Sequence, residues 1–230
     1  MKWQTLFAAC FCSQGFAQES ANLSLVVLAT SDWTYHGVSE TRGEPSVGIN
    51  LDWQPTRHLF LGVEAHQGRV SAERQREGSV MGYIGTGWSL SENWYGTLAL
   101  QQREFPGSTK EWDITEFTTS FTHDSGLRAS LSYSPDYYEH NTEAANIEIG
   151  YVHQSNRRWH WSFEAGTTEF FEDEPRFVDY QYARAGIGLS FGRSNVNVAY
   201  AWTNASATET FGAESNESPG LVVGFSYRVQ

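Results

Sequence analysis

Hydrophobic and polar residues alternate along most of this chain with a period of two. The alternation is clearest at 127–134, 147–151, 159–166, 196–203 and 221–229, where every second residue is apolar or aromatic. Because successive side chains of a strand point to opposite faces, the pattern predicts strands with one apolar and one polar face. The polar face carries charged residues, whereas the other face is lipophilic.

Twelve strands of this kind are expected. Their lengths, near ten residues, suit tilted strands that cross a bilayer. The predicted ranges are 23–31, 45–54, 58–68, 79–90, 93–103, 112–123, 127–135, 145–154, 158–169, 180–191, 195–204 and 219–229.

The connections between these strands alternate in length. Short links at 55–57, 91–92, 124–126, 155–157 and 192–194 interleave with longer ones at 32–44, 69–78, 104–111, 136–143, 170–179 and 205–218. This alternation is typical of an all-β, transmembrane antiparallel up-and-down β-barrel whose two ends differ. We therefore expect about 12 strands, with short periplasmic turns and longer extracellular loops.

A soluble β-sandwich or a lipocalin-like barrel is the alternative fold, and its apolar face would point inward. Two features favour the membrane barrel. The polar face holds too many ionisable groups for a dry core, and aromatic residues gather near strand ends, as interfacial girdles require. Those aromatic residues are Trp33, Tyr35, Trp53, Trp88, Trp94, Tyr95, Trp112, Tyr137, Tyr138, Trp159, Trp161, Trp202 and Tyr227.

Composition narrows the class further. The chain is 40% hydrophobic and 15% aromatic, yet its mean hydropathy is −0.47. No run of 18 apolar residues occurs, which excludes a helical membrane protein on length. The formal net charge of −12 argues against nucleic acid as a partner.

The first 17 residues have the pattern of a secretory signal peptide. Lys2 precedes a short apolar core at 6–12, and Gly15 and Ala17 supply small residues before the expected cleavage. Residues 18–230 then form one outer-membrane β-barrel domain, exported to the cell outer membrane of a Gram-negative bacterium. Both cysteines, Cys10 and Cys12, would be removed with the signal, so no disulfide or cysteine metal site is expected.

Charged and histidine residues of the polar faces are candidates to line a lumen. Rows of opposite charge across a narrow pore set its size and charge selectivity, and the acidic excess would favour cations if water passes. The alternative is that these side chains pair with one another and fill the barrel. The candidates are Asp52, Glu64, His66, Glu116, Arg128, Glu148, His160, Glu164, Arg184 and Arg228.

One short motif raises the possibility of an enzyme. His153, Ser155 and Asn156 resemble the active-site segment of outer-membrane lipid hydrolases, in which a histidine base activates a serine. The same residues suit an ordinary tight turn, and the topology puts them at the periplasmic end, away from an outer-leaflet substrate. We expect no catalytic residue.

Metal and cofactor signals are weak. The acidic stretch 172–174 could gather divalent cations near lipopolysaccharide, although a solvated loop is the simpler interpretation. The seven histidines have no metal-ligand spacing, and no phosphate loop or dinucleotide fingerprint occurs. We therefore expect no metal and no cofactor.

Two stretches carry a family resemblance. SDWTYHGVSETRGEPSVGINLD at 31–52 resembles the N-terminal signature of the TorF-type porins, and YSPDYY at 133–138 is similar to a second recurring segment of that family. These are proteobacterial outer-membrane proteins with a signal peptide and a β-barrel. The resemblance implies a channel and supplies no solute. The chain departs from the family at His36, where arginine is usual, and at the last residue, Gln230.

The resemblance and the strand count together predict the partners of the protein and the position of the loop 32–44. Gly224, Tyr227 and Val229 retain the positions of a C-terminal barrel-insertion signal, which implies the barrel-assembly machinery and periplasmic chaperones during biogenesis. Outer-membrane lipid and lipopolysaccharide would surround the barrel. The loop 32–44 is expected to face outward and fold toward the pore mouth, with Asp32, His36, Gly37 and Arg42 as its key residues.

The sequence therefore favours an outer-membrane porin-like channel for passive diffusion of small polar solutes or ions. Two alternatives stay open. One is a closed barrel with a structural or adhesion role through its loops, and the other is a lipid hydrolase that uses His153 and Ser155.

Overall fold

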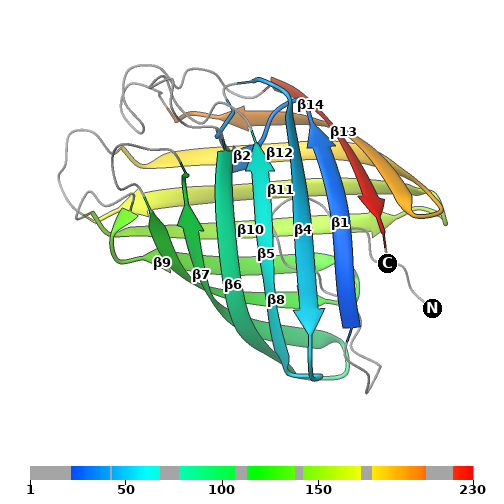
Figure 1. The fold of residues 1–230 in the computed structure, drawn as a ribbon, viewed down its shortest axis with the longest axis horizontal. Helices are drawn as coiled ribbons and strands as arrows, with labels where there is room; N and C mark the ends of the chain where they lie inside the picture. The colour runs from blue at the N-terminus through cyan, green and yellow to red at the C-terminus, as the bar shows by residue number, and fades with distance from the viewer. Residues whose placement is uncertain are drawn as a thin grey trace.

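The chain folds into a closed barrel of antiparallel strands (Figure 1). The computed structural model describes residues 22–41, 43–67, 78–106, 113–137, 142–171, 178–205 and 220–229. Each strand of the barrel pairs with its neighbour in the chain, and the last strand closes onto the first. Among the described residues, no helix is long and apolar enough to cross a bilayer.

Twelve strands form the barrel, as expected, and each boundary lies within two residues of the predicted one. A separate two-stranded hairpin, β2 (Thr34–Tyr35) and β3 (Val38–Ser39), was not expected. The barrel strands are β1 (Asn22–Thr30), β4 (Ser46–Gln54), β5 (Leu59–Gln67), β6 (Gly78–Ser89), β7 (Trp94–Glu104), β8 (Ile114–His123), β9 (Leu127–Ser134), β10 (Ala144–Gln154), β11 (Trp159–Phe170), β12 (Tyr180–Phe191), β13 (Ser194–Thr203) and β14 (Gly220–Arg228).

The register keeps one face of every strand turned outward and apolar. On β4, for example, Val47, Ile49 and Leu51 are 40–49% exposed, whereas Ser46 and Asn50 between them are buried. Directly paired residues share a face, so this alternation continues around the barrel. A surface of exposed aliphatic and aromatic side chains suits lipid rather than water, which identifies the fold as a transmembrane barrel.

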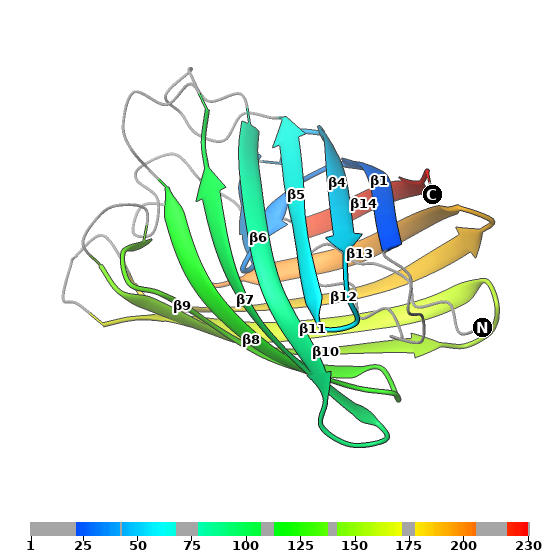
Figure 2. The same ribbon diagram turned by 60° about the horizontal axis from the view of Figure 1, so that its bottom comes forward.

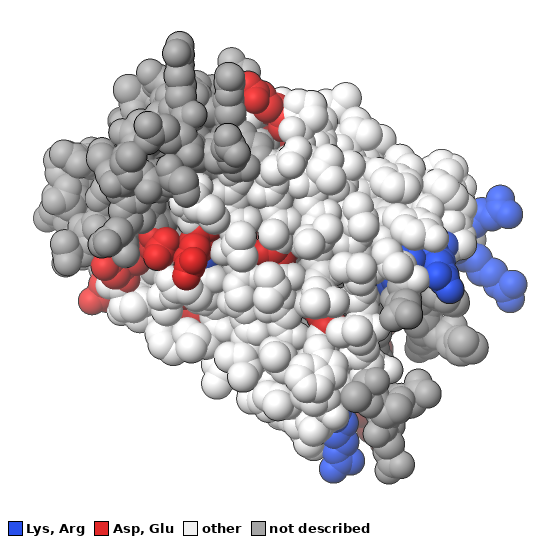
Figure 3. Space-filling model, in the orientation of Figure 1, with Lys and Arg blue, Asp and Glu red and all other residues white. Residues whose placement is uncertain are grey.

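Charge gathers at the two ends of the barrel. Figure 3 shows a wall nearly free of charged side chains, with the blue arginines at one end and most of the red Asp and Glu side chains at the other. The described short turns carry the exposed arginines Arg57, Arg157, Arg158 and Arg193. The described end of the chain lies at the same end, where the Val229 N–H donates to the Leu25 carbonyl at 2.8 Å (Figure 2).

The inner face uses glycine to seat aromatic rings. Gly62 lies opposite Tyr83, and Gly166 lies opposite Tyr182. A Cβ at either glycine would come within 2.5 Å of the tyrosine ring or hydroxyl. The absence of a side chain therefore lets each ring lie flat across the neighbouring strand, which reduces the space the ring takes from the lumen.

The aromatic residues at strand ends divide into two groups. Trp53, Trp88, Trp94, Trp159, Trp161, Trp202 and Tyr227 are exposed on the outer wall, as a girdle requires. The girdle interpretation is wrong for Trp33, Tyr35, Tyr137 and Tyr95, whose hydroxyl is buried over Gly87 on the inner face. Trp33 and Tyr137 are buried, and Tyr35 contacts buried residues of the barrel interior. Trp112 and Tyr138 lie outside the described residues, as do the expected signal peptide 1–17, Arg42 and the acidic stretch 172–174.

Candidate functional site

The connection between β1 and β4 folds into the lumen as a tight hairpin. Its two central residues, His36 and Gly37, both have positive φ, at 44° and 76°. Tyr35 pairs with Val38 on either side of them. This is the geometry of a type I′ turn, whose twist matches that of the flanking strands. We call residues 32–43 the lumen hairpin, and the expectation of an outward-facing loop is wrong for its described residues.

Asp32 holds the base of the lumen hairpin together. Its Oδ1 accepts hydrogen bonds from Ser39 Oγ (2.5 Å), Thr41 Oγ1 (2.9 Å) and the Gly43 N–H (3.2 Å). Its other oxygen, Oδ2, is buried and has no hydrogen-bond partner among the described residues. Oδ1 thus accepts the three hydrogen bonds that close the loop, and Oδ2 accepts none from the described residues.

Trp33 fixes the lumen hairpin to the barrel wall. The Trp33 N–H donates to Thr41 Oγ1 at 2.9 Å, and the Trp33 carbonyl accepts from the Glu40 N–H at 2.7 Å. The indole stacks on His66 of β5, with ring centroids 4.3 Å apart and planes at 18°. Gly48 of β4 leaves room for this ring, since a Cβ there would lie 3.0 Å from it. The hairpin is therefore packed against β4 and β5 at its base.

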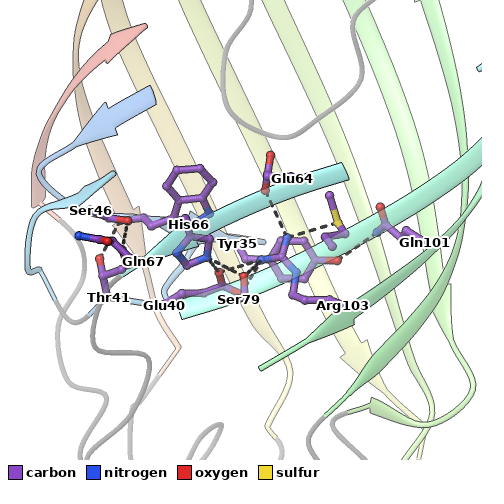
Figure 4. Close-up of polar contacts among 12 residues, drawn as sticks. Tyr35, Glu40, Thr41, Ser46, Glu64, His66, Gln67, Ser79, Gln101 and Arg103 are labelled. Atoms are coloured by element: carbon purple, nitrogen blue, oxygen red, sulfur yellow. Dashed lines mark hydrogen bonds and ion pairs between the residues drawn. The ribbon is translucent and has the colours of Figure 1, made fainter. Parts of the chain in front are cut away.

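A buried ion pair joins the lumen hairpin to β7, the second strand beyond β5 in the barrel. Arg103 Nη1 on β7 donates to both carboxylate oxygens of Glu40, at 3.0 and 2.8 Å (Figure 4). His66 Nε2 lies 2.9 Å from Glu40 and 2.8 Å from the hydroxyl of Ser79. Loss of one member would leave an unpaired buried charge, which costs about 3–5 kcal/mol. This network holds the hairpin in place.

The tip of the lumen hairpin reaches β8. The Tyr35 hydroxyl donates to Glu116, and His36 Nε2 lies 3.1 Å from the other oxygen of the same carboxylate. Gln101 Nε2 donates to Glu116 at 2.5 Å, and the Arg103 guanidinium lies 4.0 Å from the centre of the Tyr35 ring. The Glu116 carboxylate therefore contacts both Tyr35, which precedes the turn, and His36, which is its first central residue.

The turn itself meets the far wall. A Cβ at Gly37 would lie 2.2 Å from the Cβ and Cγ of Tyr182 on β12. Only glycine fits there, both because of this contact and because of its positive φ. The lumen hairpin thus extends from β4 and β5, past β8, to β12, and it divides the lumen.

Burial and neighbouring charges shift the pKa values of the hairpin residues. Burial lowers the pKa of His36 to about 4, although the Glu148 carboxylate opposes this, so its ring is neutral at pH 7. Burial opposes the ionisation of Glu40, but Arg103 and His66 outweigh it and bring the pKa below its usual range. Burial raises the pKa of Asp32 in spite of its three hydrogen bonds.

Beyond the tip, a second group of charges lines the wall from β9 to β12. Arg128 forms an ion pair with Glu148. The Tyr182 hydroxyl donates to Glu148 at 2.9 Å. Glu164 and Arg184 lie directly opposite each other in the register of β11 and β12. Charges of both signs therefore continue through the middle of the barrel.

All ten candidate lining residues lie on the inner face. The register places Glu64 and His66 beside the lumen hairpin, Glu116 at its tip, and Arg128, Glu148, Glu164 and Arg184 in the second group. Asp52, His160 and Arg228 belong to neither group and lie near the short-turn ends of their strands. The expected loop residues Asp32, His36 and Gly37 belong to the lumen hairpin, whose tip contacts Glu116 and Tyr182, each the third residue of its strand counted from the end that bears the longer connections.

Sequence reasoning missed three residues of this site. Arg103 continues the inward alternation of β7 two residues after Gln101, so the period of two could have identified it. Tyr182 could have been found in the same way on β12. Glu40 gave no signal, because a glutamate in a polar loop resembles any solvated residue.

The residues of the hydrolase motif are not arranged for catalysis. His153 faces outward from β10, opposite Trp161 and stacked near Tyr151. The Ser155 N–H donates to the Trp159 carbonyl at 3.0 Å and closes the β10–β11 turn. No hydrogen bond joins His153 to Ser155 in the described part of the chain. The same part contains no cluster of His, Cys, Asp or Glu that could hold a metal ion.

Part of the lumen beside the hairpin is empty. A cavity of about 70 Å³ lies between the ascending limb of the hairpin and the wall made by β12, β13, β14 and β1. Val26, Leu28 and Trp33 supply apolar surface, and Asp32 and Arg184 supply charge. The other side of the mouth is closed by an apolar cluster of Phe105, Ile114, Tyr137 and Ala144 with Tyr35 and Phe170. The cavity therefore lies along one wall of the lumen, and the apolar cluster lies near the ends of other strands.

Solved structures with a similar fold are outer-membrane barrels. The NanC porin aligns over 89% of this chain and 97% of its own, with a TM-score of 0.57 and 8% identity. A structure from a study of in-meso crystallization of membrane proteins aligns over 91% and 84%, with a TM-score of 0.54 and 8% identity. The Pseudomonas putida toluene transporter TodX aligns over 93% and 90%, with a TM-score of 0.48 and 10% identity.

The first two likenesses show the fold, which is a β-barrel like that of the NanC porin. The sequence matches no protein-family model and no curated protein.

Proposed function

We propose that this chain is an outer-membrane channel through which small polar solutes or ions diffuse passively. The observation that carries the proposal is a closed barrel, apolar outside and charged inside, with a hairpin that narrows the lumen and leaves a cavity beside it. A structural barrel without transport would have no need of a charged interior with unused polar groups.

Acidic groups outnumber basic ones along the proposed path, so the channel should prefer cations. The described acidic side chains of the inner face and the lumen hairpin are Asp32, Glu40, Asp52, Glu64, Glu116, Glu148 and Glu164, and the arginines are Arg103, Arg128, Arg184 and Arg228. Glu40 and Glu148 are neutralised by ion pairs with arginine. Each ion pair removes one acid and one arginine, so the excess of three acidic groups, seven against four, is unchanged by the pairing and supports a modest preference.

We further propose the protein family, the orientation in the membrane and the export route that fit this function. The 31–52 stretch supports a TorF-type porin, and that stretch includes the lumen hairpin and the first residues of β4. The short, arginine-bearing turns would face the periplasm and the longer loops the exterior. Export through a signal peptide at 1–17 and assembly by the barrel-assembly machinery complete the proposal.

Planar-bilayer recording of the refolded protein tests the function. We expect discrete single-channel steps, and a reversal potential in a salt gradient that indicates a cation preference. A protein that is folded by its heat-modifiable gel mobility and yet gives no steps would refute the channel.

A further inference from the structure

The cavity beside the lumen hairpin contains polar groups that the protein itself does not use. Asn197 of β13 is 1% exposed, and neither its amide oxygen nor its amide nitrogen has a hydrogen-bond partner among the described residues. A buried amide without a partner is destabilising, because no hydrogen bond replaces those it made with water in the unfolded chain. Such a group is retained where water or a solute supplies the missing hydrogen bonds.

Asp32 presents a second unused group to the same cavity. Its Oδ1 accepts all three hydrogen bonds that close the lumen hairpin, and these bonds fix the orientation of the carboxylate. Its Oδ2 is buried without a hydrogen-bond partner in the described residues, and Asp32 lines the cavity. The free oxygen can therefore accept a hydrogen bond from a cationic or N–H group of a ligand.

Arg184 supplies the opposite charge. It lines the cavity from β12, directly opposite Glu164 of β11, with which it interacts electrostatically without a salt bridge or hydrogen bond among the described residues. It lies near enough to Asp32 to interact with that carboxylate electrostatically, yet the two do not form a salt bridge. A guanidinium offers several N–H donors in a plane, which match a carboxylate. The Asp32 carboxylate and the Arg184 guanidinium thus line the same cavity and form no salt bridge with each other.

The size and walls of the cavity limit what fits. About 70 Å³ of free space holds several waters, at roughly 10–15 Å³ for each. Val26, Leu28 and Trp33 form an apolar wall between the charged groups. A ligand with a cationic end, an anionic end and a short apolar body would satisfy every unused group at once.

We propose that this cavity is a binding site for a small zwitterion of the amino-acid type. Arg184 binds the carboxylate, Asp32 Oδ2 accepts from the ammonium, and the Asn197 amide bonds to whichever group lies beside it. Val26 and Leu28 contact the short side chain. The place of this site on the permeation path rests on the proposed channel function, whereas the binding of a zwitterion does not depend on it.

Calorimetric titration of the refolded, detergent-solubilised barrel tests binding. The probes are glycine, glycolate, which lacks the ammonium, and ethanolamine, which lacks the carboxylate, all at pH 7. Each charge-assisted contact is strong enough that its loss weakens binding about tenfold or more, so glycine should bind at least that much more tightly than either partial analogue. Equal affinities for the three probes, or no heat of binding for glycine, would overturn the proposal.

Two variants locate the site. Arg184→Gln and Asn197→Leu should each weaken glycine binding about tenfold, while Arg157→Gln, in an exposed short turn, should leave it unchanged. Gel mobility before and after heating shows whether each variant is folded. Full glycine affinity in both folded cavity variants would contradict the assignment.

Bilayer recording of the same proteins separates this proposal from the channel itself. Glycine should reduce the open current of the unmodified barrel in a concentration-dependent way, and Arg184→Gln should abolish this reduction. Steps of current that glycine does not affect would refute the place of the site on the permeation path and leave the channel standing. Calorimetric binding without any current would refute the channel and leave the site standing.

Discussion

The two sides of the lumen differ in how completely their polar groups are used. On the side of β5 to β8, Glu40, Arg103, His66 and Glu116 contact one another or the lumen hairpin at hydrogen-bond distance. On the side of β12 to β1, Asn197 remains without a partner in the described chain. The first side has the organisation of a folded core, whereas the second keeps polar groups without a protein partner. The proposed route for solute would follow the second side.

Removal of the Glu40 charge should have the largest effect on the filled side. In Glu40→Gln the buried Arg103 guanidinium keeps only the more distant Glu64, at 3.9 Å, as a charged partner, and breaking a buried ion pair costs about 3–5 kcal/mol. We expect the lumen hairpin to leave its place for part of the time, which single-channel recording would detect as new, larger conductance levels.

Glu44→Gln is the matched control, because Glu44 is an exposed acid at the end of the same segment. It should keep the conductance levels of the unmodified barrel. The same levels in Glu40→Gln as in this control would show that the ion pair does not hold the hairpin.

Substitution of the turn glycine should have a smaller effect. Gly37→Ala adds a Cβ that overlaps the Tyr182 ring, in addition to backbone strain of about 1–2 kcal/mol at positive φ. We expect short openings to larger conductance levels, counted in the same recordings.

Gly43→Ala separates the two causes. Gly43 also has positive φ, at 73°, but a Cβ there would meet nothing within 4 Å. It should open the channel less often than Gly37→Ala. Equal effects of the two variants would mean that the tip of the hairpin does not press against β12.

Acid should weaken the docking of the lumen hairpin through His36. Its pKa is about 4 in the docked hairpin and 6.5 when the ring is exposed, so the docked state binds fewer protons between these values. Docking is therefore at full strength above pH 6.5 and is lost progressively as the pH falls toward 4. Single-channel recordings should show more frequent openings to the larger conductance levels at pH 4.5 than at pH 7.

His36→Gln removes this titration and should reduce the difference between the two pH values. Glu40, whose pKa lies below its usual range in the docked hairpin, still acts in the same direction below about pH 4.5, and some acid sensitivity should persist. An unchanged pH response in His36→Gln would assign the effect to other groups.

The strands could be predicted because their signal is local. Alternation on β4, at Val47, Ile49 and Leu51, follows directly from the two environments on either side of a barrel wall. The same parity correctly placed residues such as Glu148 and Arg184 on the inner face. Whether those side chains meet water or one another depends on what else enters the lumen, and alternation carries no information about that.

The lumen hairpin could not be predicted for the same reason. Glu40 and Arg103 are 63 positions apart, and only the closed barrel brings them together. Trp33 follows the end of a strand, where a lipid-facing aromatic residue is usual, and its burial depends on His66 and Gly48. The His36-Gly37 turn lacks the asparagine or aspartate that usually marks a type I′ hairpin.

The central claim is that the lumen hairpin narrows a conducting barrel. Its most direct test replaces residues 33–41 with a short Gly-Ser link and compares single-channel conductance with that of the unmodified barrel. We predict that conductance rises about threefold or more, because the hairpin no longer divides the lumen. Equal conductance in the two proteins, both folded, would contradict the account.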